Sequence, residues 1–143
     1  MKPFRKYLEE HTADILFQAQ AETLGELFEQ CALAVEESQV ELDGIKPKKK
    51  TLITGENKNL DYLLFDFLED LLVYKDSEQL LFSKFEVDVQ EKDGVYSLSC
   101  NAYGEKLNPK KHEQKVDVKA ITMHLFEVKK EGKLWKAQVL IDI

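Results

Sequence analysis

The amino-acid sequence predicts an α+β fold in which two helices pack on a mixed, mostly antiparallel β-sheet. Two segments carry apolar residues at helical spacing, and several others alternate apolar and polar residues as half-buried strands do. No linker rich in Gly, Pro and Ser divides the 143 residues. We therefore expect residues 1–143 to form a single two-layer domain.

Both predicted helices have recognisable beginnings. Thr23 and Glu26 have the spacing of a capping box, and Asn59 is a good N-cap for the second helix. The apolar stripe of the first helix consists of Leu24, Leu27, Phe28, Cys31, Ala34 and Val35. The stripe of the second consists of Leu60, Leu63, Leu64, Phe67, Leu68, Leu71 and Leu72. The other face of the second helix is expected to be solvated, and it carries Asp61, Asp66, Glu69 and Asp70.

The remaining periodic segments predict two hairpins. The first alternates over residues 84–90, turns at 92–94 and returns over 96–102. The second runs from about Val118 to Val128, turns at 131–132 and returns from Leu134. Shorter strands are expected at 15–20 and 51–55. The predicted core includes Phe28, Leu64, Phe67, Leu71, Val87, Leu98, Val139 and Ile141.

Composition and charge favour a cytoplasmic protein. No apolar run is long enough to span a membrane, and the N-terminus lacks the apolar core of a signal peptide. Cys31 and Cys100 lack metal-ligand spacing, so both are expected to be buried and inert. The net charge of −7 argues against nucleic-acid binding by the whole surface.

Polar residues cluster at 11–14, at 104–124 and at the end of the chain. The carboxylates of Asp142 and of the chain end at Ile143 would repel each other unless a cation lay between them. With Asp14 they would form an all-oxygen set suited to Ca²⁺ or Mg²⁺. The alternatives are a solvated chain end and a turn-forming Asp14. Lys119 enters an apolar strand, where it must reach solvent or meet a carboxylate such as Asp14 or Asp142.

Lysines are concentrated in two segments of this acidic chain, at 46–50 and at 106–119. They could meet phosphate or an acidic partner, or they could be solvated loops. The sequence contains no Walker loop and no GxGxxG, GxSxG or HExxH motif, so the standard catalytic signatures are absent. His112 and the other histidines lack helical metal spacing and are expected to be hydrogen-bonded structural residues.

These clusters, in this order, resemble the archease family over essentially the whole chain. The matching residues are His11-Thr12-Ala13-Asp14, Thr23–Phe28, Gly104-Glu105 with His112, Val118-Lys119-Ala120-Ile121-Thr122 with His124, Trp135 and Leu140-Ile141-Asp142-Ile143. Met123 departs from the pattern, because the family has an aromatic residue before the histidine.

The resemblance implies an accessory protein of tRNA splicing rather than an enzyme. Archeases activate the RtcB-type RNA ligase by promoting the ligase–guanylate intermediate, which supports multiple turnover, and they meet RNA only through the ligase. The family's divalent-metal site falls on Asp14, Asp142 and Ile143, with Ca²⁺ as the first choice and Mg²⁺ or Mn²⁺ as alternatives. Its functionally important lysine falls on Lys119. The competing hypotheses are a free-standing metal-dependent hydrolase or nuclease and a chaperone-like binding module.

Overall fold

A computed structural model describes the backbone of residues 1–10 and 13–143, and the side chains of 1–8 and 13–143. In these ranges the strands form two antiparallel sheets. The four-stranded sheet has the order β1 (Phe4–Glu10), β2 (Asp14–Ala21), β7 (Leu134–Asp142), β6 (Ala120–Glu131). The three-stranded sheet has the order β3 (Lys49–Asn57), β5 (Val95–Lys106), β4 (Leu80–Lys92).

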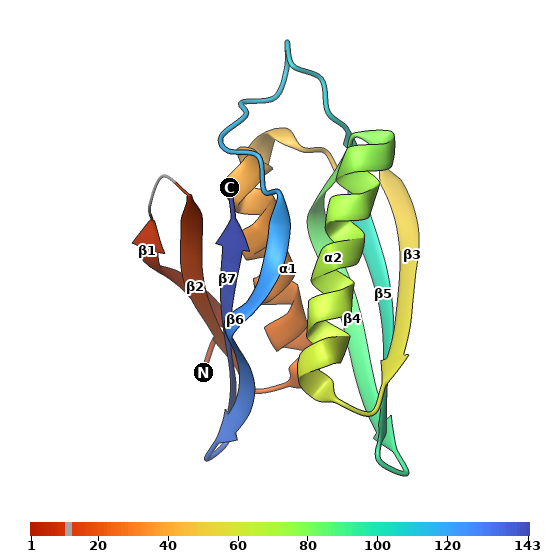
Figure 1. The fold of residues 1–143 in the computed structure, drawn as a ribbon. Helices are drawn as coiled ribbons and strands as arrows, with labels where there is room; N and C mark the ends of the chain where they lie inside the picture. Colours follow the sequence, from red (N-terminus) through yellow and green to blue (C-terminus); the bar gives the residue numbers. More distant parts are fainter. Residues whose placement is uncertain (11–12) are drawn as a thin grey trace.

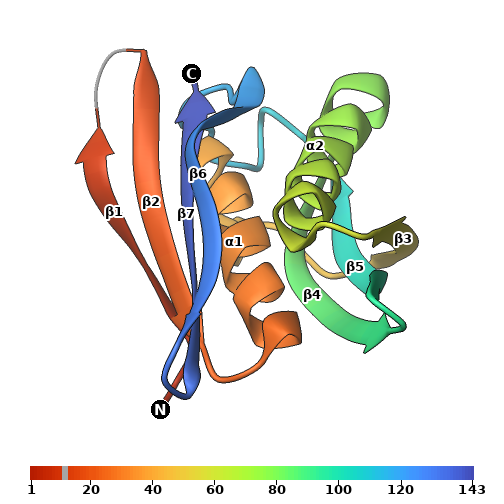
Figure 2. The same ribbon diagram turned by 60° about the horizontal axis from the view of Figure 1, so that its bottom comes forward.

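The helices α1 (Leu24–Gln39) and α2 (Leu60–Glu78) lie between the two sheets, and a single 3₁₀ turn, η1 (Leu42–Gly44), follows α1 (Figures 1 and 2). Helix α1 packs on β2 and β7 from one side and on β4 from the other, while α2 contacts β6 as well as β3. The predicted α+β class, with two helices on antiparallel sheet, is confirmed. The predicted two-layer arrangement with a single mixed sheet is wrong, because the described strands divide into two sheets on either side of the helices and all pair antiparallel.

Both helices begin at the predicted N-caps, although the Glu26 carboxylate accepts a hydrogen bond from the Thr23 hydroxyl at 2.9 Å rather than from a backbone N–H. Thr23 Oγ1 accepts a hydrogen bond from the Glu26 backbone N–H at 3.2 Å. Asn59 Oδ1 accepts from the N–H groups of Asp61 and Tyr62 at 2.8 and 3.2 Å. Each acceptor satisfies backbone donors that have no partner inside the helix. Both predicted N-termini are thus confirmed.

The core lies in the helical layer and on the inner faces of both sheets. Phe28 of α1 stacks on Phe67 of α2 with ring centroids 6.0 Å apart. Every predicted core residue is buried except Val87, which is only partly buried and packs at the edge of the cluster. Cys31 and Cys100 are buried free thiols, as expected, and burial raises the pKa of both.

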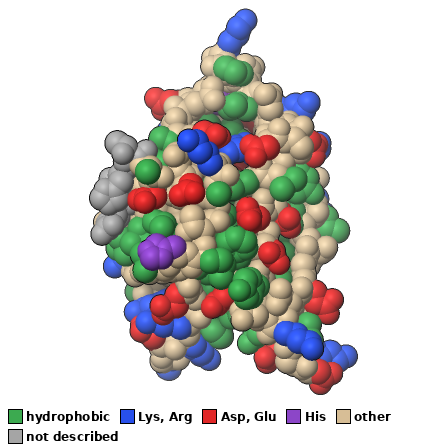
Figure 3. Space-filling view, in the orientation of Figure 1, with side chains coloured by type: hydrophobic (Ala, Val, Ile, Leu, Met, Phe, Trp, Pro, Cys, Tyr) green, Lys and Arg blue, Asp and Glu red, His purple; other side chains and the backbone are tan. Residues whose placement is uncertain are grey.

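The acidic face of α2 is less solvated than the sequence predicts. Of its four acidic residues only Asp66 is exposed, and Asp61 Oδ1 accepts a hydrogen bond from the Val128 N–H of β6 at 3.2 Å. Partial burial, and next the charge of Asp66, raise the pKa values of Glu69 and Asp70. Acidic side chains gather over α2 in Figure 3. In the described residues, no helix is long and apolar enough to cross a membrane.

Candidate functional site

Strand pairing brings Asp14 and Asp142 together. Asp14 opens β2 and Asp142 closes β7, and their Cα atoms are direct partners in the antiparallel register. Directly opposed residues project to the same side of a sheet with Cβ atoms about 5 Å apart. Their neighbours Ile15 and Ile141 are buried toward the helices, so the two carboxylates lie on the outer face.

Backbone hydrogen bonds hold Lys119 and Ile143 next to this pair. The Lys119 N–H donates to the Asp142 carbonyl at 2.8 Å, and the Ile143 N–H donates to the Ala13 carbonyl at 3.0 Å. The Lys119 side chain is exposed. His11 and Thr12, which belong to the same sequence cluster, lie outside the described residues.

Asp14 and Asp142 form a small donor set. In the part of the chain that the structure describes, no three His, Cys, Asp or Glu side chains are close enough to hold a metal ion. The pair offers only carboxylate oxygens. Oxygen donors of this kind fit a hard cation such as Ca²⁺ or Mg²⁺ rather than a softer metal.

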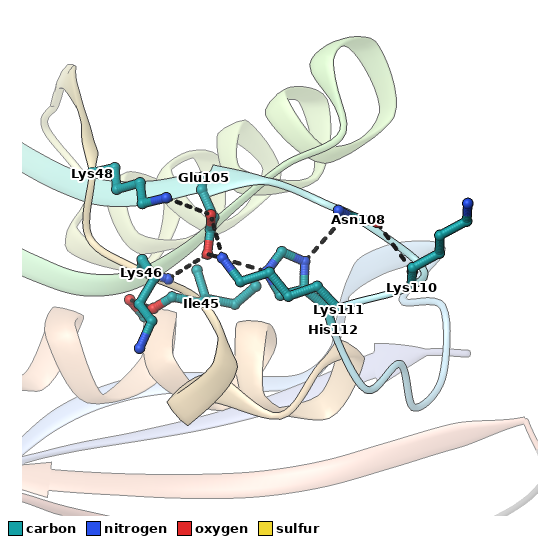
Figure 4. Close-up of polar contacts among 9 residues, drawn as sticks. Ile45, Lys46, Lys48, Glu105, Asn108, Lys110, Lys111 and His112 are labelled. Atoms are coloured by element: carbon teal, nitrogen blue, oxygen red, sulfur yellow. Dashed lines mark hydrogen bonds and ion pairs between the residues drawn. The ribbon is translucent and has the colours of Figure 1, made fainter.

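A second polar cluster centres on Glu105 at the end of β5 (Figure 4). The Glu105 carboxylate accepts hydrogen bonds from the Lys46 N–H at 2.6 Å, from Lys111 Nζ at 3.2 Å and from His112 Nε2 at 3.1 Å. The backbone bond from Lys46, followed by those from His112 and Lys111, lowers the pKa of Glu105 to about 2. Glu105 therefore stays ionised and joins two loops.

His112 serves as a structural residue in this cluster. Its Nδ1 accepts a hydrogen bond from the Asn108 N–H at 2.9 Å, so the ring hydrogen sits on Nε2, which donates to Glu105. The side chain is fully buried. The expectation that His112 is a hydrogen-bonded structural residue is confirmed.

The sequence analysis missed Glu36, a fully buried carboxyl group on α1. Its Oε2 accepts a hydrogen bond at 2.7 Å from the N–H of Phe82, beside an irregularity in the register of β4 and β5. Burial raises its pKa to about 8, although this hydrogen bond and Lys75 act in the opposite direction. The sequence did indicate this burial, because Glu36 lies four residues after Ala32 and eight after Phe28, on a buried side of the helix.

Gly104 lies beside the same irregularity for a steric reason. A Cβ atom at this position would lie 1.8 Å from the carbonyl oxygen of Leu81. Strands β4 and β5 can approach this closely only because residue 104 has no side chain. The Gly104-Glu105 pair thus combines a close strand approach with the carboxylate that joins the loops.

Sequence comparison gives a consistent result over the whole fold. A model of the Archease protein family (MTH1598/TM1083) matches residues 6–143. Protein archease of Pyrococcus furiosus is 44% identical over 136 residues, covering 94% of this chain and 95% of the relative. Protein archease of Pyrococcus abyssi is 41% identical over 145 residues and covers both chains completely. The chain belongs to the archease family.

Solved structures agree with this assignment. The solution structure of Methanobacterium thermoautotrophicum protein 1598 has a TM-score of 0.85 and 34% identity, covering 97% of this chain and 98% of that one. The crystal structure of a Thermotoga maritima archease, described as a possible chaperone, has a TM-score of 0.63 and 19% identity. That alignment covers 96% of this chain and 97% of the other, and it supports the fold alone.

Proposed function

We propose that this protein activates an RtcB-type RNA-splicing ligase by promoting guanylylation of the ligase, and that it is an accessory protein rather than an enzyme. The partner is the one that the resemblance to the archease family implies, and the chain belongs to that family. The observation that carries the proposal in this chain is the direct opposition of Asp14 and Asp142 across β2 and β7. A pair of like charges held this close favours a bound cation.

The proposed metal site consists of the side chains of Asp14 and Asp142 and the α-carboxylate of Ile143. Ca²⁺ suits this set best because it accepts flexible all-oxygen coordination, while Mg²⁺ and Mn²⁺ are alternatives. The backbone hydrogen bonds of Lys119 to Asp142 and of Ile143 to Ala13 support the proposal, because they fix the backbone positions of the residues around the site.

Lys119 has a separate role in this proposal. Its ammonium group either offsets the charge of the carboxylates or contacts a phosphate of the nucleotide. A bound divalent ion would stabilise charge that develops during phosphoryl transfer in the ligase. Asp14 and Asp142 hold the ion, and Lys119 adds a positive charge beside it.

The test measures the rate of guanylate transfer to the ligase with GTP, Mn²⁺ and sub-stoichiometric activator. Asp14→Asn and Asp142→Asn should abolish the stimulation, because each removes a charge that holds the cation. Lys119→Ala should also lose stimulation while retaining some metal binding. Asp88→Asn, an exposed carboxylate on β4, is the matched control and should stimulate fully. A folded Asp14→Asn protein with full stimulation would contradict the proposal.

The contribution of Ile143 is tested by titration calorimetry. Ca²⁺ and Mn²⁺ are titrated into the native protein and into a variant extended beyond residue 143, in which the α-carboxylate is displaced. The extended protein should bind more weakly while keeping its melting temperature. Equal affinity would remove the α-carboxylate from the site.

The competing hypotheses are tested with the protein alone, in the absence of the ligase. A free-standing hydrolase or nuclease would degrade RNA or nucleotides alone. A general chaperone would bind unrelated unfolded chains. The activator should do neither and should act only when the ligase is present.

A further inference from the structure

The positive charge of this protein is concentrated in two short segments. Residues 45–50 and 105–111 contain seven lysines and a single acidic residue, a net charge of +6. The other 130 residues together carry −13. We call the seven side chains the lysine surface; all are exposed, and they are Lys46, Lys48, Lys49, Lys50, Lys106, Lys110 and Lys111.

Contacts of Glu105 hold these two segments, about 60 residues apart in sequence, next to each other (Figure 4). The carboxylate accepts from the Lys46 backbone and from Lys111 Nζ, and Lys48 Nζ lies 3.9 Å from its Oε1. Strand pairing adds a second connection, because Lys49 is the register partner of Gly104. The lysine surface is therefore a built feature of the fold rather than two independent loops.

Most of this charge is not neutralised from within. Glu105 is turned inward, with a side chain only 13% exposed, and Lys49 pairs with Glu78 at 3.7 Å. Among the described residues, no ion pair is found for four members of the surface, which are Lys46, Lys50, Lys106 and Lys110. Holding like charges together in an acidic protein costs energy, which an anionic ligand would recover.

We propose that the lysine surface binds the phosphate backbone of single-stranded RNA directly, in contrast to the expectation from the family resemblance that the protein meets RNA only through the ligase. Lysine is depleted from the cores of protein–protein interfaces, whereas phosphate oxygens are typical partners of lysine ammonium groups. RNA is preferred over other polyanions on the basis of the proposed function. The binding test itself does not involve the ligase, so the two proposals fail independently.

The test compares two triple variants of equal net charge. Lys46→Gln, Lys50→Gln and Lys110→Gln together alter the lysine surface but leave the side chains that contact Glu105 in place. Lys58→Gln, Lys92→Gln and Lys133→Gln together form the control, at exposed positions outside the two segments. Melting temperatures establish that both variants are folded. Binding of a labelled single-stranded oligoribonucleotide is then measured by fluorescence anisotropy over a range of salt concentrations.

Each lost phosphate contact should reduce the slope of log K against log salt by about 0.7 for a single strand. Three lost contacts lower the slope by about 2, which corresponds to roughly a hundredfold weaker binding at about 0.1 M salt if the affinities converge near 1 M. The control variant should bind nearly as well as the native protein. Guanylylation of the ligase in the absence of RNA should be unchanged in both.

Three results would overturn the proposal. The first would be that the native protein fails to bind RNA, the second that both triple variants lose the same affinity, and the third that polyglutamate competes as well as unlabelled RNA. The second would show that only net charge matters, and the third that the surface recognises acidic chains in general. The Asp14→Asn variant is expected to lose stimulation of the ligase but to keep RNA binding, because the two sites act separately.

Discussion

Replacement of Glu36 by Gln should stabilise this protein at neutral pH. Glu36 is fully buried on α1, and its pKa rises from the usual 4.5 to about 8, with desolvation as the largest cause. At pH 7 the folded protein therefore keeps a proton that the unfolded chain has released. Gln imitates the neutral acid in shape and retains an oxygen to accept from the Phe82 N–H.

The magnitude follows from proton linkage. Where the folded state binds one proton more than the unfolded state, the free energy of unfolding falls by about 1.4 kcal/mol per pH unit as pH rises. This loss begins near pH 4.5 and ends near pH 8, where folded Glu36 ionises as well. At pH 7 the wild type has lost about 3 kcal/mol that Glu36→Gln retains.

Urea denaturation between pH 5 and pH 8 measures this difference directly. The two proteins should have similar free energies of unfolding at pH 5, and above pH 5 the free energy of the variant should increasingly exceed that of the wild type. In thermal melts at pH 7 the difference should correspond to a melting temperature roughly 10 °C higher for the variant. Glu56→Gln, an exposed carboxylate on β3, corrects for the general effect of net charge. If the stability of Glu36→Gln stays parallel to that of the wild type over this range, then Glu36 is ionised in the fold and the reasoning is wrong.

Four further variants test the packing and the loop cluster. Glu105→Gln should destabilise the protein at pH 7 but converge with the wild type as pH falls from 4.5 toward 2, because the lowered pKa contributes stability only while Glu105 is ionised; thermal melts over that range measure it. Gly104→Ala should lose about 1–3 kcal/mol by urea denaturation, since its Cβ would strike a backbone oxygen. In Gly55→Ala the new Cβ would meet only the side chain of Leu63, at 3.3 Å, so this variant should lose less free energy of unfolding. Leu64→Ala, at a fully buried position, should lose roughly 2–5 kcal/mol in the same assay.

Local chemistry made much of the fold predictable. The caps at Thr23 and Asn59 satisfy donors within a few residues, so their effect can be seen in the sequence alone. The hairpin β4–β5 was also predictable because Gly94, at a positive φ, marks its turn. Strand β1 was missed, since it is an edge strand in which charged residues interrupt the apolar pattern. Division into two sheets was missed because alternation identifies a buried face but not its partner.

The candidate site was predictable only in part, for the same reason. Asp142 and Ile143 are neighbours in sequence and Asp14 was a candidate third ligand, but a solvated chain end and a turn-forming Asp14 stayed open as alternatives until the family resemblance favoured the site. The register of β2 and β7 now brings Asp14 and Asp142 together, while their proposed role as metal ligands stays a prediction. Glu36 was missed although its helical spacing from Phe28 and Ala32 indicated burial. Glu105 was named in a polar cluster, but its inward orientation depends on contacts with Lys46 and His112 that lie far apart in sequence or in a loop, so the sequence did not predict it.

The position of β7 between β2 and β6 affects how this chain folds. The three-stranded sheet and α2 use a continuous segment, residues 49–106, whereas the β2–β7 pair joins Gln18 to Gln138, 120 residues away. Such a distant closure is entropically costly and slow, so we expect it to follow the local assembly. Asp14 and Asp142 face each other only after that closure. A partly folded chain therefore cannot present the pair, and a partner that recognises it meets only molecules whose folding is complete.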